Sequence, residues 1–102
     1  MESLTGKQKR YLRSLGQRLH AEIAVGKTGV SETLRAHLDR LLDERELAKV
    51  RLGEGTTGGD RRRAAEELAA GVGAFCAGVV GRTALLYKPN ESLPIEKRIL
   101  LG

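Results

Sequence analysis

A strand signal, a glycine turn and a helix signal follow one another between residues 23 and 42, and this succession constrains the fold most. An apolar run at residues 23–25 stops at the segment 26–29, which reads Gly-Lys-Thr-Gly. Apolar residues then recur at helical spacing through Leu34, Leu38, Leu41 and Leu42. A strand that turns directly into an amphipathic helix predicts an α/β domain.

The segment 26–29 has the form G-x-x-G, which suits contact with phosphate. Gly26 and Gly29 allow the backbone to approach a ligand without a Cβ in the way, and Lys27 adds a full positive charge. The helix that follows directs free N–H groups toward the same place. These residues therefore predict phosphodiester binding at the loop, and a plain glycine turn stays open as the alternative.

Two nucleotide-binding motifs come close to matching and are rejected. A P-loop ending at Gly26-Lys27-Thr28 requires a glycine at position 21, where the chain has Ala21. Residues 53–58 satisfy G-x-G-x-x-G, but a dinucleotide fold needs an acidic residue about 20 residues further on. The strand expected there ends Val-Val-Gly at 79–81. A loop that clamps nucleic-acid backbone, as in KH modules, fits residues 26–29 without a missing residue.

The charge is basic and unevenly distributed. Eighteen Lys and Arg stand against thirteen Asp and Glu, a net charge of +5 in 102 residues. Residues 1–30 carry +4, residues 31–60 carry −2 and residues 61–102 carry +3. Basic ends that fold onto one side would suit a polyanion, while an ordinary surplus of Lys and Arg remains the other interpretation. Three aromatic residues, Tyr11, Phe75 and Tyr87, argue against a base-stacking platform.

Three helices and four strands are expected. The first helix signal spans residues 4–19 with Thr5 as N-cap, and it places Lys9, Arg10 and Arg13 opposite its apolar stripe, with Lys7 at the edge. Ser31 is expected to cap the second helix, whose core face would include Val30. Asp60 is expected to cap the third helix, which would run to about residue 71. Arg61, Arg62 and Arg63 would lie in the first turn of that helix, where a nearby anion would be favourable. The expected strands are 23–25, 47–52, 75–80 and 83–87.

These elements predict a small α-β-α-β-α-β-β two-layer sandwich with a mixed four-stranded sheet. The first three strands are expected to be parallel and the fourth antiparallel to the third, joined at Gly81-Arg82 by a glycine-first hairpin turn. Lys49 and Arg51 would share one face of the second strand. The tail 90–102 either packs as an extended segment or lies loose.

Catalysis is not expected. His20 and His37 lack metal-ligand spacing, and Cys76 lies within an apolar strand, where a buried and inert thiol is expected. The chain has neither a leader-like N-terminus nor an apolar run of the roughly 20 residues that span a bilayer. We therefore expect a cytoplasmic monomer without cofactor, metal, membrane or small-molecule substrate.

Four segments, in order, carry a family resemblance that spans about residues 3–89. They read Leu-Thr-Gly-Lys-Gln-Lys-Arg-Tyr-Leu-Arg at 4–13, Val-Gly-Lys-Thr-Gly-Val at 25–30, Glu-Leu-Ala-Lys-Val at 46–50 and Val-Gly-Arg-Thr-Ala-Leu-Leu-Tyr-Lys-Pro at 80–89. The sequence resembles the YhbY family of bacterial single-domain proteins, whose fold is called the CRM (chloroplast RNA splicing and ribosome maturation) domain. The expected division is a CRM-type RNA-binding domain at 1–89 and a C-terminal tail at 90–102.

The resemblance implies a fold similar to the C-terminal domain of translation initiation factor three. It also implies binding to structured ribosomal RNA and association with large-subunit precursors as an assembly factor. RNA contact by the family's G-x-x-G loop carries over to Gly26, Lys27, Thr28 and Gly29. Our own interpretation extends the RNA-binding surface to Lys7, Lys9, Arg10, Arg13, Lys49, Arg51, Arg82 and Lys88. The alternative is a ribosome-associated protein-interaction module, acting through the second helix or the tail, in which the loop is only a structural turn.

Overall fold

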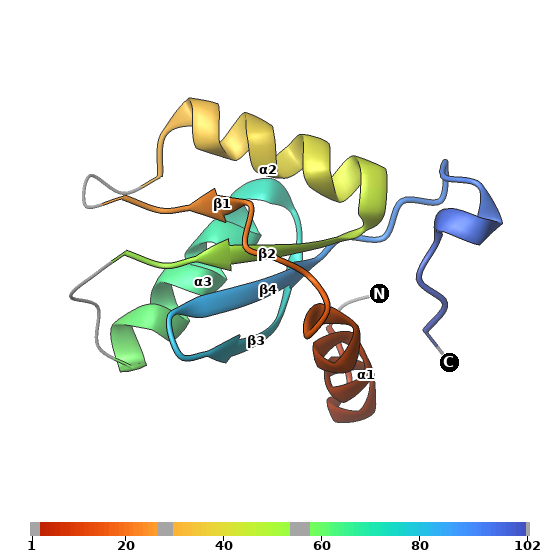
Figure 1. Ribbon diagram of the computed structural model, residues 1–102, viewed down its shortest axis with the longest axis horizontal. Helices are drawn as coiled ribbons and strands as arrows, with labels where there is room; N and C mark the ends of the chain where they lie inside the picture. The colour runs from red at the N-terminus through yellow and green to blue at the C-terminus, as the bar shows by residue number, and fades with distance from the viewer. Residues whose placement is uncertain (1–2, 27–29, 54–57, 102) are drawn as a thin grey trace.

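The computed structural model describes residues 3–26, 30–53 and 58–101, and it contains three α-helices and a four-stranded sheet (Figure 1). The α/β class predicted from the sequence is confirmed. None of the helices in these described ranges is long and apolar enough to cross a membrane. The elements are α1 (Gly6–Gly16), β1 (Ile23–Ala24), α2 (Glu32–Arg45), β2 (Leu47–Arg51), α3 (Gly58–Val72), β3 (Phe75–Val80), β4 (Thr83–Tyr87) and the short 3-10 helix η1 (Ile95–Lys97).

The strands lie in the order β1-β2-β4-β3. β1 runs parallel to β2, while β4 is antiparallel to both β2 and β3. Because β2 and β3 both oppose β4, the first three strands share one direction, as predicted, and β4 is inserted between them. Gly81 has a φ of 58° and Arg82 does not have a positive φ, which agrees with the expected glycine-first hairpin turn.

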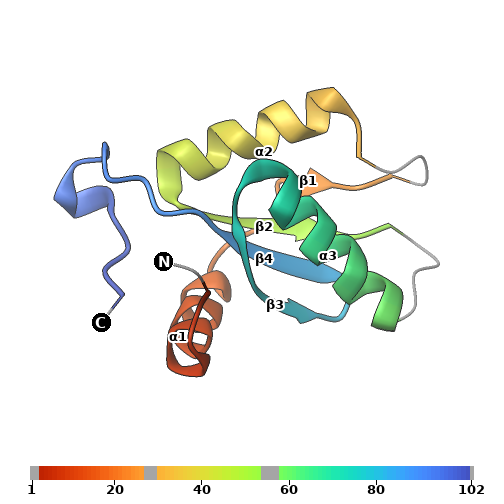
Figure 2. The same ribbon diagram turned by 180° about the vertical axis from the view of Figure 1, so that it is seen from behind.

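Helices cover both faces of the sheet. Val50 and Leu86 pack with Leu38 of α2 and Leu68 of α3, so this pair of helices and the sheet form the predicted sandwich. Leu85 packs instead with Leu12 of α1. Since neighbouring residues of a strand point to opposite faces, α1 lies on the other face and adds a third layer to the two that were predicted. Figure 2 views the sheet from the side that α3 covers.

The helix starts show where local signals succeed and fail. Thr5 forms a capping box with Gln8, and the Ser31 hydroxyl accepts a hydrogen bond from the Leu34 N–H, as predicted. The predicted cap at Asp60 is wrong, because α3 has already begun at Gly58 and the Asp60 carboxylate lies 3.6 Å from Arg63. Val30, expected on the core face, precedes α2 and is 41% exposed.

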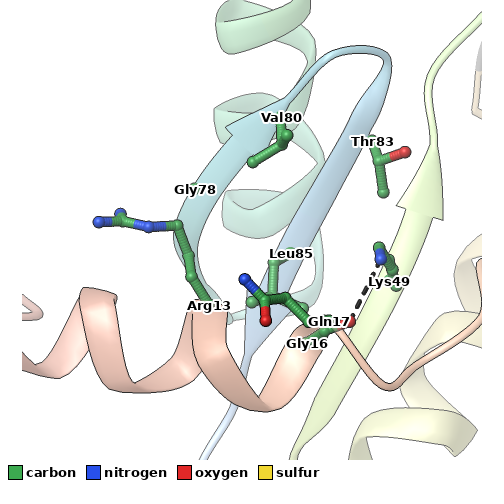
Figure 3. A pocket seen from close by; sticks show the side chains of 8 residues that line it. All are labelled: Arg13, Gly16, Gln17, Lys49, Gly78, Val80, Thr83 and Leu85. Carbon is green, nitrogen blue, oxygen red and sulfur yellow. Dashed lines mark hydrogen bonds between the residues drawn. The ribbon is translucent and has the colours of Figure 1, made fainter.

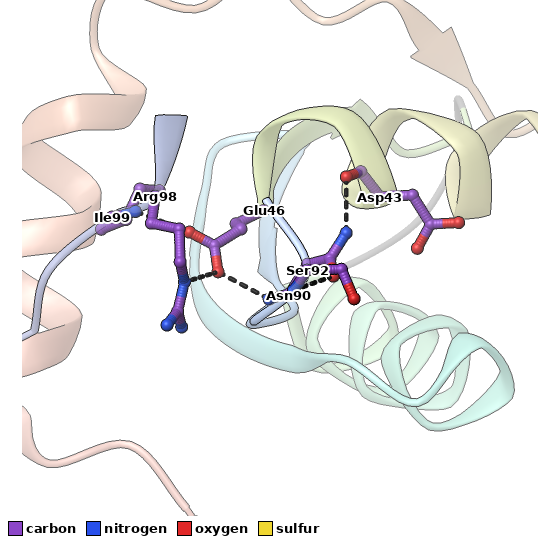
Figure 4. Close-up of polar contacts among 6 residues, drawn as sticks. All are labelled: Asp43, Glu46, Asn90, Ser92, Arg98 and Ile99. Carbon is purple, nitrogen blue, oxygen red and sulfur yellow. Dashed lines mark hydrogen bonds and ion pairs between the residues drawn. The ribbon is translucent and has the colours of Figure 1, made fainter. Parts of the chain in front are cut away.

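The C-terminal segment packs against the domain through Glu46, which settles the question left open by the sequence (Figure 4). Glu46 ends α2 in the left-handed conformation, with a φ of 63°, and its side chain is fully buried. Its carboxylate accepts hydrogen bonds of 2.6 Å from the backbone N–H groups of Asn90 and Ile99, and Arg98 Nε lies 3.3 Å away. Ile99 and Leu101 pack against the α1 side of the core.

Candidate nucleic-acid interface

The outer face of α1 carries cations and no acidic residue of the same helix. The helix contains Lys7, Lys9, Arg10 and Arg13 and no Asp or Glu. Its apolar side is buried against the sheet through Leu12, which leaves the basic side outward as the helical spacing predicted. Among the residues that the structure describes, no carboxylate lies within ion-pair distance of these four side chains. Their charge is therefore available to an external anion.

Arg13 is anchored at the edge of the sheet. Its Nη1 donates a 3.3 Å hydrogen bond to the carbonyl oxygen of Ala77 in β3, an edge strand. A Cβ at Gly78 would lie 2.9 Å from Cδ of Arg13, so the glycine lets the arginine stem lie directly on the strand. The guanidinium keeps further N–H donors for a ligand, because arginine carries five.

Lys49 has an internal role that the sequence did not indicate. It shares a face with Arg51, as predicted, but its Nζ lies 3.2 Å from the carbonyl oxygen of Gly16 and 3.4 Å from that of Leu19. Gly16 is the last residue of α1 and Leu19 lies in the turn that follows it, so the ammonium is at the negative end of the helix dipole, where a cation is stabilising. Lys49 thus connects β2 to the end of α1.

A second group of predicted residues meets at one end of the sheet. Gly26 follows β1, and Arg51 ends β2 opposite Thr83 of β4, next to Arg82 in the hairpin turn. Gly26 and both arginines are exposed. Lys27, Thr28 and Gly29 lie outside the described residues, so the predicted loop contacts remain predictions.

Lys88 lies apart from both groups. Its Nζ is 3.8 Å from the Asp39 carboxylate of α2, on the face of the sheet opposite α1. Lys88 follows β4 at the end of the sheet away from the hairpin turn. This predicted site residue therefore lies beside α2 and away from Arg51 and Arg82.

Arg62 of α3 was noted as a charge in the sequence but not included in the predicted site. It lies with Lys9 and Arg13 around the outer edge of β3, where a hollow of about 320 Å³ is also lined by the Glu66 side chain. The spacing of the sequence could not show this, since α1 and α3 meet at β3 only in the folded chain. The neighbouring Arg61 donates to the carbonyl oxygen of Gly81 at 3.4 Å.

Cys76 also lines this hollow and is half-buried, less enclosed than the sequence predicted. Burial raises the pKa of its thiol, which disfavours the reactive thiolate. No cluster of three or more His, Cys, Asp or Glu residues suited to a metal occurs within the described ranges. The charged groups around the edge of β3 are three cations, Lys9, Arg13 and Arg62, and the carboxylate of Glu66.

The fold and this surface define a small α/β domain with a face suited to a polyanion. The sequence profile of the CRS1/YhbY (CRM) domain family matches residues 4–88, and the chain belongs to that family. It is 35% identical over 95 residues to a probable RNA-binding protein of Pseudomonas aeruginosa, covering 89% of this chain and 90% of that protein. It is 36% identical over 88 residues to the probable RNA-binding protein YqeI of Bacillus subtilis, covering 86% and 91%.

A solved structure has the same fold. The solution structure of a hypothetical protein from Staphylococcus aureus, described as a candidate RNA-binding protein, aligns with a TM-score of 0.79 and 34% identity. The alignment covers 96% of this chain and 99% of that one. The resemblance inferred from the four sequence segments is therefore confirmed at the level of family and fold.

Proposed function

We propose that this chain is a non-enzymatic RNA-binding protein that holds structured ribosomal RNA through α1 and the adjoining end of the sheet. The observation that carries the proposal is the set of four cations on α1 without an acid on that helix or an ion-pair partner in the described part of the chain. Such a surface gains free energy from a polyanion because neutralised phosphates release counterions. The RNA-binding descriptions of the relatives support the same partner.

The finer part of the proposal concerns the target and the loop. We infer association with precursors of the large ribosomal subunit in the cytoplasm, as an assembly factor. Gly26 and Gly29 would provide close backbone approach, with Lys27 supplying charge and Thr28 a hydroxyl donor. Arg51 and Arg82, exposed at the end of the sheet where Gly26 follows β1, would extend that contact along the RNA backbone.

Sedimentation of cell lysate tests the target. Tagged wild-type protein is compared with the double variant Lys27→Asp, Thr28→Asp, after circular dichroism has shown that both are folded. We expect the wild type to travel with large-subunit particles and the variant to remain at the top of the gradient. A parallel titration of purified protein with ribosomal RNA should show affinity falling steeply with salt, and a flat response would contradict the proposal.

The alternative function is a protein-interaction module on the ribosome, in which the loop is only a turn. The tail favours it, because Leu100 is 64% exposed and lies with Tyr11 and Lys7 around a hollow of about 210 Å³. On this alternative, the loop variant would sediment with the particles as the wild type does. Loss of association in a Leu100→Asp variant would then assign the contact to the tail.

A further inference from the structure

Two hollows meet at Arg13, and they differ in chemistry. The first, of about 260 Å³, lies on the α1 face of the sheet and is shown in Figure 3. The second is the hollow of about 320 Å³ around the edge of β3. Arg13, Gly78 and Val80 line both, so the two hollows adjoin. A ligand could therefore occupy both while lying across the Arg13 side chain.

The first hollow exists because α1 stops short of covering the sheet. The helix ends at Gly16, whose added Cβ would lie 2.9 Å from both methyl carbons of Leu85. This close approach places the end of α1 against β4 and leaves the rest of that face open. Val80 and Leu85 provide an apolar surface there, and Val80 is 70% exposed. Such a surface suits a flat, weakly polar group.

Three polar side chains beside this apolar surface, those of Gln17, Thr83 and Lys49, can form further hydrogen bonds. Within the described ranges, the Gln17 amide and the Thr83 hydroxyl make no side-chain hydrogen bond. The Lys49 ammonium uses two contacts on the end of α1 and has three N–H donors. An amide, a hydroxyl and an ammonium together can serve the donor and acceptor edge of a nucleobase, whose faces are apolar.

The second hollow offers the matching site for a phosphate. Lys9, Arg13 and Arg62 line it together with the carboxylate of Glu66, so cations outnumber the acid. Arg13 is held in place by its bond to the Ala77 carbonyl oxygen and keeps N–H donors that can bind a phosphate in paired fashion. The phosphate site and the base site thus lie on either side of one anchored arginine.

We propose that these two hollows hold one unpaired nucleotide of an RNA, with its base on the surface formed by Val80 and Leu85 and its phosphate on Arg13. This inference rests on the proposed function and adds to it a pocket for a base, beyond the clamp on the RNA backbone. A duplex keeps its bases stacked and cannot fill the first hollow. The protein therefore prefers RNA with unpaired nucleotides, such as a loop or a bulge.

A filling substitution tests the proposal. Thr83→Phe places a ring in the first hollow at a half-buried strand position that tolerates aromatics. The control is Thr33→Phe, which adds the same ring at an exposed position of α2. The probes are a fluorescent stem-loop RNA with a uridine loop, the same RNA with abasic loop nucleotides, and the fully paired duplex. Thermal unfolding of both variants is measured first.

We expect wild type and Thr33→Phe to bind the uridine loop about tenfold or more tightly than the duplex or the abasic loop. Thr83→Phe should bind all three probes with the affinity that wild type has for the duplex. If Thr83→Phe retains the preference, or if wild type has none, the base pocket is overturned while RNA binding stands. If wild type binds no RNA, the proposed function fails and the pocket with it.

Photocrosslinking of wild-type protein keeps the proposal falsifiable if Thr83→Phe does not fold. A loop containing 4-thiouridine should crosslink to peptides that contain residues 13–17, Lys49 or residues 77–88, and crosslinks confined to other peptides would overturn the pocket. A fluorescent acidic peptide is the probe for the rival occupant. If it binds as tightly as the RNA and displaces it, the hollows are a protein-binding site and the nucleotide assignment is wrong.

Discussion

Helices α1 and α2 are built alike but differ in outward charge. Each begins with a hydroxyl side chain that caps a backbone N–H, and each buries leucines against the sheet. Yet α1 carries four cations and no acid, whereas α2 mixes three arginines with four acids. Two acids at α2 form ion pairs, Glu22 with Arg45 at 2.8 Å and Asp39 with Lys88 at 3.8 Å. Folding has the same requirements of both helices, so the excess charge of α1 supports the proposal that this helix binds an anionic ligand.

We expect the largest effect on RNA binding from reversing the charge of α1. Lys9→Glu, Arg10→Glu and Arg13→Glu combined should lower affinity for ribosomal RNA by about a hundredfold or more at moderate salt, because contacts with phosphate are replaced by repulsion. The salt dependence of log affinity should flatten by about one unit per lost contact. Binding is measured by fluorescence anisotropy across a salt series.

The matched control reverses exposed charges on α2, through Arg35→Glu and Arg40→Glu. We expect affinity and salt dependence close to those of wild type after correction for the smaller net charge. Equal losses from the two helices would show that RNA senses only the total charge, which would remove the special role of α1.

The C-terminal end of α2 provides the next largest effect. Glu46→Ala should lower the free energy of unfolding by about 2 kcal/mol, because the N–H groups of Asn90 and Ile99 lose their buried acceptor. Urea denaturation measures the change. Glu44→Ala, which removes an exposed carboxylate two residues earlier, should change stability by no more than about 0.5 kcal/mol. Similar values for both would contradict the importance assigned to the buried carboxylate.

The helix caps test the similarity of the two helices. Thr5→Ala and Ser31→Ala should each cost about 1 kcal/mol of stability, since each removes the hydroxyl that accepts the first-turn N–H. Thermal unfolding and RNA affinity are measured on the same samples. RNA affinity should be unchanged for Ser31→Ala, and a stability loss confined to one variant would show that the caps are not equivalent.

The smallest effect concerns the ion pair beside α2. The hydrogen bond from Arg45 holds the pKa of Glu22 below its ordinary value of 4.5. Because the folded-state pKa is lowered, the stabilisation is present above the unfolded pKa and is lost as pH falls through the folded one. NMR titration of the Glu22 carboxyl should show this low pKa, and Arg45→Ala should return it toward 4.5. If Arg45→Ala leaves the pKa of Glu22 unchanged, the ion pair between Glu22 and Arg45 does not persist in solution.

Local signals in the sequence predicted the helices and strands and the basic outer face of α1. The caps at Thr5 and Ser31, the hairpin turn at Gly81 and the basic face of α1 depend on residues within a few positions of one another, and all agree with the structure. Local signals failed at Asp60, because it lies within the first turn of α3 and so cannot mark its start.

Features that depend on distant contacts could not be predicted. The insertion of β4 between β2 and β3 pairs residues far apart in the chain, for which single-strand patterns carry no information. The same holds for the second role of Lys49, because its spacing in the sequence does not show that its ammonium also contacts the end of α1. Arg62 lines the second hollow, where α1 and α3 approach β3, and the first hollow is lined by residues of α1, β2, β3 and β4. No spacing in the sequence specifies either arrangement.

The contacts of Glu46 extend beyond the segment that matches the family. The family match ends at residue 88, whereas the buried carboxylate has its partners at Asn90, Arg98 and Ile99. A protein shortened to the matched region would keep the four family segments except Pro89 and would leave the buried carboxylate of Glu46 without its partners in the tail. We therefore expect that a protein that folds on its own extends at least to Ile99, so that its end is chosen from the contacts of Glu46 and not from the family alignment.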